Sequence, residues 1–112
     1  MVLSVKETKK IRKMFSDTDQ TMAATFKVLG DVNRYRIFRI LTGQPKLSVS
    51  SIARILNISL PLVSQHIKIL VNADLLQKER SGKKVYPKLK YNNPFVQAAV
   101  KTIQHALTTN RK

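Results

Sequence analysis

The residues best able to do chemistry in this sequence are its lysines and arginines. They number 21 against 6 aspartates and glutamates, which gives a net charge of +15 at pH 7. Such side chains bind phosphates and release the counterions that condense on a polyanion, and solubility alone does not require so one-sided a balance. The largest positive excess lies between residues 60 and 90. The charge therefore favours a polyanionic partner, with nucleic acid as the first candidate.

Other reactive side chains are scarce. The sequence has no cysteine, which excludes disulfides, thiolate metal sites and cysteine nucleophiles. Its two histidines, His66 and His105, would need ligands from a small acidic set to hold a metal. There is also no glycine-rich phosphate loop and no nucleophile paired with a base. We therefore expect no enzyme activity, no cofactor and no metal site.

Residues 48–73 have the pattern of two short helices joined by a tight turn. Ser48 is suited to cap the first helix, and Asn57 to end it in a left-handed conformation. Ser59 can cap a second helix that runs to about residue 73, with Pro61 tolerated in its first turn. Two helices joined by only three residues predict a helix-turn-helix.

Residues 75–90 predict a β-hairpin. Leu75–Arg80 and Lys84–Leu89 have the composition of two short strands around a turn at residues 81–83, and basic side chains lie at the tip. A basic hairpin directly after a helix-turn-helix predicts a wing.

Two helices are also expected before this region. Asp17 or Thr18 can cap a helix that ends at Gly30, a glycine suited to a left-handed stop. Asp31 can cap the next helix, which runs to about Thr42. The side chains expected to face inward from that helix are Tyr35, Phe38 and Leu41.

The terminal segments, residues 1–16 and 93–110, predict helices with apolar stripes that a domain of this size cannot easily cover alone. Asn93 and Pro94 should open the last helix as its cap and its first residue. Because small domains often gain stability by oligomerising, we expect a homodimer formed by these two helices. The predicted interface residues are Ile11, Met14, Phe15, Val96, Val100, Ile103 and Leu107.

The length of 112 residues predicts one domain, residues 1–112. It should be mainly α with a small β-hairpin: a winged helix-turn-helix with about five to six helices, a two-stranded wing and a homodimeric assembly. No run of hydrophobic residues exceeds three, which argues against a membrane-spanning helix and against the apolar segment of a secretory signal. We therefore expect a soluble cytoplasmic protein without a membrane partner.

Two segments resemble a known family. Residues 26–41, FKVLGDVNRYRIFRIL, and residues 47–89, which include VSQHIKIL and ERSGKKVYPKL, are similar to the ArsR/SmtB family of prokaryotic winged-helix repressors. The flanking helices also lie where that family has its dimerisation helices. The sequence departs from the pattern at Asp74, where glycine is usual, and at Leu60 and Pro61, at the usually polar start of the recognition helix. The resemblance implies a dimeric repressor that binds double-stranded DNA.

The helix from Leu60 should read DNA, because an α-helix fits the major groove and its first turns project toward base edges. If Val63 and Ile67 face the core, the opposite side of the helix faces outward. On that side Gln65 can bond adenine bidentately. The alternative is an ordinary solvated helix face. The predicted DNA contacts on this helix are Leu60, Pro61, Ser64, Gln65 and Lys68.

The basic wing should bind backbone phosphates or the minor groove. Lys88 and Lys90 should extend its positive patch. Charged strands also discourage edge-to-edge aggregation, which is the competing interpretation. His66, at the edge of the apolar stripe, is expected to be packed and hydrogen-bonded rather than to contact DNA. The predicted DNA contacts in the wing are Lys78, Arg80, Lys83 and Lys84.

Members of the family commonly sense metals, and this sequence differs at the corresponding positions. The family's metal-site helix has two cysteines separated by one residue, whereas the segment LSVSSI has Ser48 and Ser50, whose hydroxyls cannot replace thiolates. The alternative family site lies across the two last helices of a dimer and resembles an acid, two histidines and a further histidine or glutamate. Here His105 is the only histidine in that region, and no acid follows Arg80. We therefore expect no metal response through these sites.

Together these features predict a sequence-specific DNA-binding transcriptional regulator, a repressor that binds an inverted repeat as a dimer. The main alternative is a nucleoid- or RNA-associated winged-helix protein that binds without sequence preference. A protein-interaction module that uses the wing surface is a more distant alternative. The sequence leaves the effector, the operator and the target genes open.

Overall fold

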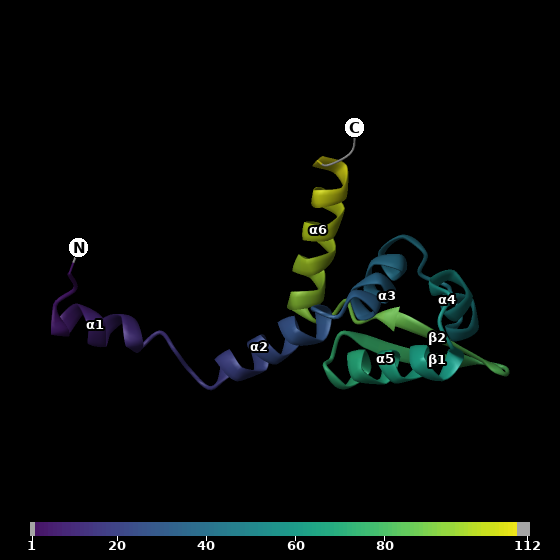
Figure 1. The fold of residues 1–112 in the computed structure, drawn as a ribbon, viewed down its shortest axis with the longest axis horizontal. Helices are drawn as coiled ribbons and strands as arrows, with labels where there is room; N and C mark the ends of the chain where they lie inside the picture. The colour runs from purple at the N-terminus through teal and green to yellow at the C-terminus, as the bar shows by residue number, and fades with distance from the viewer. Residues whose placement is uncertain (1, 110–112) are drawn as a thin grey trace.

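In the computed structural model, residues 2–109 are described, and they form six helices and one two-stranded antiparallel hairpin. The elements in order are α1 (Val5–Arg12), α2 (Thr18–Leu29), α3 (Val32–Gly43), α4 (Val49–Leu56), α5 (Leu60–Asn72), β1 (Leu76–Ser81), β2 (Lys84–Leu89) and α6 (Pro94–Thr109). Figure 1 shows α3, α4, α5 and the hairpin together at one end, with α6 rising from this body and α1 lying apart from it. The winged helix-turn-helix fold predicted from the sequence is confirmed.

Helix α3 lies at the centre of the core, where Ile37 and Phe38 have no exposed surface. Phe38 and Leu41 face inward as predicted, whereas Tyr35 is only half-buried. Positions 37, 38 and 41 lie on one side of a helix with 3.6 residues per turn, so the isoleucine completes this face and the tyrosine lies beyond its edge. The rest of the core includes Ile52, Val63, Ile67, Leu70, Leu75, Leu76, Leu89 and Val96.

Four predicted caps hold the helices around this core. Asp31 accepts hydrogen bonds from two backbone N–H groups in the first turn of α3, at 2.9 and 3.0 Å. The hydroxyls of Ser48 and Ser59 each accept a bond from a backbone N–H in the first turn of α4 and α5. The side chain of Asn93 accepts one at the start of α6, at 2.9 Å. Each cap satisfies an N–H group that has no partner within its helix.

Both ends of α2 differ from the prediction. Asp17 occupies the N-cap position but makes no side-chain hydrogen bond there. Gly30 is right-handed, with φ −74°, because only Gly30 and Asp31 separate α2 from α3 and the chain passes directly from one helix to the cap of the next. A Cβ at Gly30 would lie 3.3 Å from the carbonyl oxygen of Lys27. The glycine therefore permits a close backbone approach rather than a left-handed turn.

The first strand of the wing is shifted by one residue from the predicted Leu75–Arg80. It runs from Leu76 to Ser81, and Ser81 pairs with Lys84. The turn therefore contains only Gly82 and one lysine, and Gly82 has φ +61°. Two-residue hairpin turns need a positive φ, which glycine adopts without steric cost. At the other end of the hairpin Leu76 pairs with a second buried leucine, so the wing is anchored at its base and its basic tip is exposed.

Asp74 closes the turn between α5 and β1 in a left-handed conformation, with φ +65°. The N–H of Leu75 donates to the carbonyl of Leu70 at 3.0 Å, as expected where a left-handed residue ends a helix. The Asp74 carboxylate pairs with Lys90, and its backbone carbonyl accepts a bond from the Asn93 side chain at 2.8 Å. An aspartate thus occupies a backbone conformation that favours glycine, and it links the end of α5 to the start of α6.

Two residues of helix α6 that were predicted as dimer contacts are buried in the core of their own chain. Val96 and Val100 are only 0% and 7% exposed in the single chain. They pack in the hydrophobic core, so they have almost no surface left for a partner, and the prediction for these two residues is corrected. Ile103 is half-buried and Leu107 is exposed.

Helix α1 is shorter than the predicted 1–16. It is capped by Ser4, whose hydroxyl accepts a bond from the N–H of Glu7 at 3.1 Å. Ile11, Met14 and Phe15 are 48%, 72% and 63% exposed, so the single chain leaves this apolar side uncovered. The outermost residues of the two predicted terminal helices, 1 and 110, lie outside the described part of the chain.

Candidate nucleic-acid interface

Backbone hydrogen bonds close the turn of the helix-turn-helix. Asn57 follows α4 in the left-handed conformation, with φ +54°, and the N–H of Ile58 donates to the carbonyl of Ala53 at 3.2 Å. Ser59 then accepts a bond from the N–H of Leu62 at 3.3 Å, and α5 begins. The predicted pair of helices joined by three residues is present, with the predicted residues at its turn.

Three buried side chains fix the rotation of α5. Val63, Ile67 and Leu70 are at most 1% exposed and pack in the core. Because an α-helix has 3.6 residues per turn, the side of α5 opposite these residues must face outward. The five residues predicted to contact DNA from this helix are all exposed: Leu60, Pro61, Ser64, Gln65 and Lys68.

His66 is packed against α3 instead of facing outward. It is 8% exposed, and its Nδ1 lies 3.3 Å from Nη1 of Arg34. A guanidinium can only donate, so Nδ1 is the acceptor in this bond. Arg34 also donates through Nε to the carbonyl of Val28 at 2.7 Å. The histidine therefore joins α5 to the junction of α2 and α3, in agreement with the structural role expected for it.

Electrostatics at the same junction favour the charged form of Asp31. The hydrogen bond from the backbone N–H of Arg34 holds the pKa of the Asp31 carboxyl below its ordinary value, although burial opposes this effect. The carboxylate that caps α3 is therefore ionised at neutral pH.

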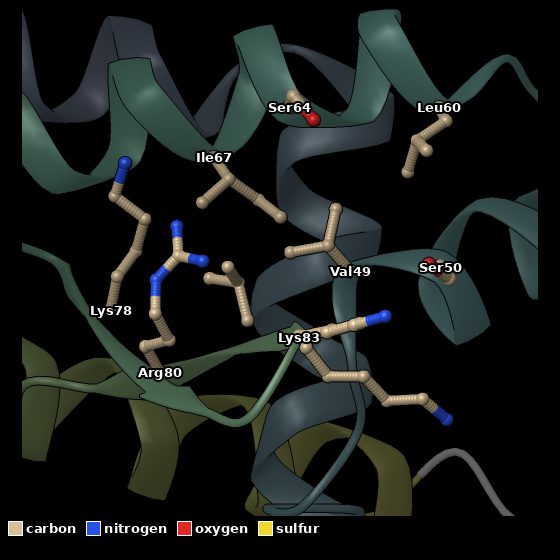
Figure 2. A pocket seen from close by; sticks show the side chains of 10 residues that line it. Val49, Ser50, Leu60, Ser64, Ile67, Lys78, Arg80 and Lys83 are labelled. Atoms are coloured by element: carbon tan, nitrogen blue, oxygen red, sulfur yellow. The ribbon is translucent and has the colours of Figure 1, made fainter.

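A cleft of about 520 Å³ lies between α5 and the wing. Figure 2 shows the side chains of Lys78 and Arg80 extending from the hairpin toward α5, on which Ser64 and Ile67 lie. The cleft thus brings together predicted contacts from the recognition helix and the wing. Its full lining is Val49, Ser50, Leu60, Ser64, Ile67, Lys78, Arg80, Lys83, Lys84 and Val85.

Of the apolar residues in this lining only Leu60 was predicted as part of the site. Val49 and Val85 are half-buried on α4 and β2, and each reaches the cleft only because the wing folds back over the helix-turn-helix. Arg54, a cation that was also not predicted as part of the site, is exposed in a second hollow of about 740 Å³ beside the turn of the helix-turn-helix. Helical periodicity marks Arg54 as outward-facing, whereas no local pattern indicates the positions of the two valines.

The positive charge of the wing is concentrated at its tip. Within residues 2–109, the ion pairs of the hairpin region join Lys88 to Glu79, at 3.7 Å, and Lys90 to Asp74. Lys88 and Lys90 are therefore partly neutralised at the base of the wing, contrary to the expectation that they extend the patch. The four predicted wing contacts, all exposed and free of ion pairs within the described chain, are Lys78, Arg80, Lys83 and Lys84.

The positions considered for metal binding are occupied by hydroxyls and one histidine. Ser48 is buried and hydrogen-bonded to Ser51, with 3.0 Å between their hydroxyl oxygens, while Ser50 lines the cleft. His105 is exposed on α6, where its neighbour is Thr109. Within the described residues no three histidine, cysteine or acidic side chains come together in a way that could hold a metal ion. None of the helices described is long and apolar enough to cross a membrane.

Comparisons with known proteins agree with this geometry. A model described as a helix-turn-helix domain matches residues 29–79. The transcriptional repressor SdpR of Bacillus subtilis (strain 168) is 34% identical over 65 residues, which cover 58% of this chain and 71% of SdpR. The cadmium resistance transcriptional regulatory protein CadC of Listeria innocua is 32% identical over 66 residues, 59% of this chain and 56% of CadC. The match thus spans only about half the length of CadC.

Solved structures show the same fold. HlyU from Vibrio cholerae has a TM-score of 0.73 at 20% identity, covering 82% of this chain and 97% of HlyU. The homodimeric winged helix-turn-helix domain of Mb0332 from Mycobacterium bovis is described as a possible ArsR-family regulator. It has a TM-score of 0.67 at 18% identity, and the match covers 100% of this chain and 94% of the Mb0332 domain. Fold and sequence matches together identify a winged helix-turn-helix domain of the kind found in DNA-binding transcriptional regulators. Within that class, the chain belongs to the ArsR/SmtB family.

Proposed function

We propose that this chain is a repressor that recognises a specific operator through the outward face of α5. The observation that carries the proposal is the exposure of Ser64, Gln65 and Lys68 on that face, beside basic wing residues without ion pairs. Glutamine can bond adenine bidentately, and lysine suits a phosphate. The name of SdpR as a repressor supports repression as the direction of regulation. Such a regulator would act on double-stranded DNA in the cytoplasm and would need no cofactor.

The proposed DNA contacts divide by chemistry. Base edges would be read from the first turns of α5, and phosphates would be bound by Lys68 and by the wing. The proposed set is Leu60, Pro61, Ser64, Gln65, Lys68, Lys78, Arg80, Lys83 and Lys84. Arg54, exposed beside the turn of the helix-turn-helix, is a further candidate for a phosphate contact.

The proposed regulator is a homodimer. Ile11, Met14 and Phe15 leave an uncovered apolar surface next to α1, and Leu107 is 40% exposed on α6. The Mb0332 domain is described as homodimeric, which supports the same assembly here. Two recognition helices related by a two-fold axis would meet half-sites roughly 34 to 36 Å apart on an inverted repeat. Sedimentation should find a dimer at micromolar concentration, and Met14→Glu with Phe15→Glu should shift it toward monomer.

Selection of bound sites from random duplex DNA tests sequence recognition directly. The proposal predicts an enriched inverted repeat with half-sites one helical turn apart. A pool without a common motif, together with equal affinity for unrelated duplexes or for RNA, would instead identify a nucleoid- or RNA-associated protein. Binding should be compared at fixed salt, because phosphate contacts make every affinity salt-dependent.

We also propose that metals do not regulate DNA binding through the usual family sites. A metal shifts a conformational equilibrium only if it binds one state more tightly, and Ser48, Ser50 and His105 provide no set of strong ligands. Zinc, cadmium, arsenite and copper, each titrated against a protein–operator complex with a chelator control, should leave DNA affinity unchanged. A reversible loss of tenfold or more would reveal a functional metal site.

A further inference from the structure

The cleft between α5 and the wing combines an apolar floor with a cationic rim. Its accessible apolar lining consists of Val49 and Val85, which are half-buried, and Leu60, which is 47% exposed, while Ile67 beneath them is buried. Its volume of about 520 Å³ lies within the range of small-molecule sites in proteins, which is roughly 300 to 1,000 Å³. The floor therefore offers apolar surface that a compact molecule could cover.

The rim carries charge of one sign. Lys78 and Arg80 rise from β1 toward the floor, as Figure 2 shows, and Lys83 and Lys84 lie at the tip of the wing. No carboxylate lines this cleft, and none of these four cations takes part in an ion pair within residues 2–109. Anions would therefore be attracted to the rim, and an arginine at its edge can bind a carboxylate through two parallel hydrogen bonds.

We propose that this cleft binds a small organic carboxylate with an apolar body, and that the bound carboxylate excludes DNA. The carboxylate would pair with Arg80 and its neighbours on the rim, and the apolar body would cover Val49 and Val85. A DNA phosphate or a free inorganic anion would bind only the cations of the rim, because it has no apolar part that could bury the apolar floor of the cleft. The cleft thus matches an amphipathic anion better than a simple one.

The regulatory half of this inference rests on the proposed function. Ser64, Lys78, Arg80, Lys83 and Lys84 belong both to the cleft and to the proposed DNA interface, so carboxylate and DNA would compete for the same side chains. For simple competition, apparent DNA affinity falls by one plus the ratio of ligand concentration to its Kd. At ten times the Kd, the loss is therefore about tenfold for each occupied chain.

The test uses naphthoate as the probe and the 112-residue chain free of DNA, with binding measured by calorimetry. We expect one saturable site per chain. Naphthamide, which lacks the charge, and sulfate, which lacks the apolar body, should each bind at least tenfold more weakly. Arg80→Gln should weaken naphthoate binding about tenfold, and Val85→Thr, which keeps the shape of the strand residue, should weaken it several-fold. The matched controls are Lys101→Gln on α6 and Val32→Thr on α3. Both residues are exposed away from the cleft, and both variants should bind naphthoate as the unaltered chain does.

Three results would overturn the ligand site: no saturable naphthoate binding, sulfate binding as tightly as naphthoate, or equal weakening by Lys101→Gln and Arg80→Gln. Naphthoate that binds at this site without lowering DNA affinity would overturn the competition. Failure of the proposed function is distinguishable, because a chain that binds no DNA at any salt concentration can still be tested for naphthoate binding alone.

Discussion

Replacing Lys83 and Lys84 together with alanine should reduce the salt dependence of DNA binding. Both side chains are exposed at the tip of the wing and form no ion pair within the described residues. Each lysine that neutralises a phosphate contributes about 0.9 to the slope of log affinity against log salt concentration. The variant should therefore lose about 1.8 of slope per chain, or about 3.6 for a dimer. Between 50 and 200 mM salt, the variant should therefore lose about tenfold less DNA affinity per chain than the unaltered protein does.

The assay is fluorescence anisotropy with a labelled duplex across that salt range, on both selected and scrambled DNA. Lys9→Ala with Lys10→Ala is the matched control, because these adjacent lysines are also exposed but lie on α1, which stands away from the wing (Figure 1). The control removes the same formal charge. If both double variants reduce the slope equally, net charge alone explains the binding. An unchanged slope for the wing variant would remove the wing from the interface.

Three further predictions concern stability, measured as the free energy of unfolding in urea. Asp31→Ala should cost about 1 kcal/mol at pH 7 by removing the cap of α3. The pKa of Asp31 in the folded chain is lowered from 3.8, so its stabilising contribution is present above pH 3.8 and is lost as the pH falls through the folded-state pKa. The difference in stability between Asp31→Ala and the unaltered chain should therefore shrink in acid. A difference that stays constant with pH would contradict the role of the carboxylate. Asp74→Ala should be about 1 kcal/mol less stable than Asp74→Gly, since both lose the pair with Lys90 but only glycine adopts φ +65° freely; equal stability would argue against backbone strain. Phe38→Ala should cost about 3 to 5 kcal/mol, because it empties the centre of the core, and a loss below 1 kcal/mol would contradict that position.

Features set by neighbouring residues were predictable from the sequence. A serine or aspartate before an apolar stripe caps a helix wherever that helix packs, so Asp31, Ser48 and Ser59 were identified correctly. The rotation of α5 follows from the spacing of its apolar residues, which is why the outward position of Gln65 could be inferred. The left-handed Asn57 was likewise predictable, because asparagine is second only to glycine at a left-handed helix end.

Features set by distant residues were not predictable in this way. An apolar stripe shows which side of a helix is buried but not which chain buries it, so Val96 and Val100 were assigned to a dimer contact although their own core contains them. The pairing of Lys90 with Asp74 depends on the return of β2 to the end of α5, across 16 residues. The apolar floor of the cleft has the same origin, because Val49 and Val85 meet only after the wing has folded.

The central claim is that the exposed face of α5 reads base sequence. Its most direct test compares Gln65→Ala with Gln104→Ala, a second exposed helical glutamine placed on α6, on the selected operator and on scrambled DNA at one salt concentration. Loss of a bidentate base contact costs about 1 to 3 kcal/mol, so Gln65→Ala should weaken operator binding about 5- to 150-fold. It should also relax the preference at one base pair, while Gln104→Ala and binding to scrambled DNA remain unchanged. Equal losses on operator and scrambled DNA, or no loss for Gln65→Ala, would contradict sequence reading by this helix.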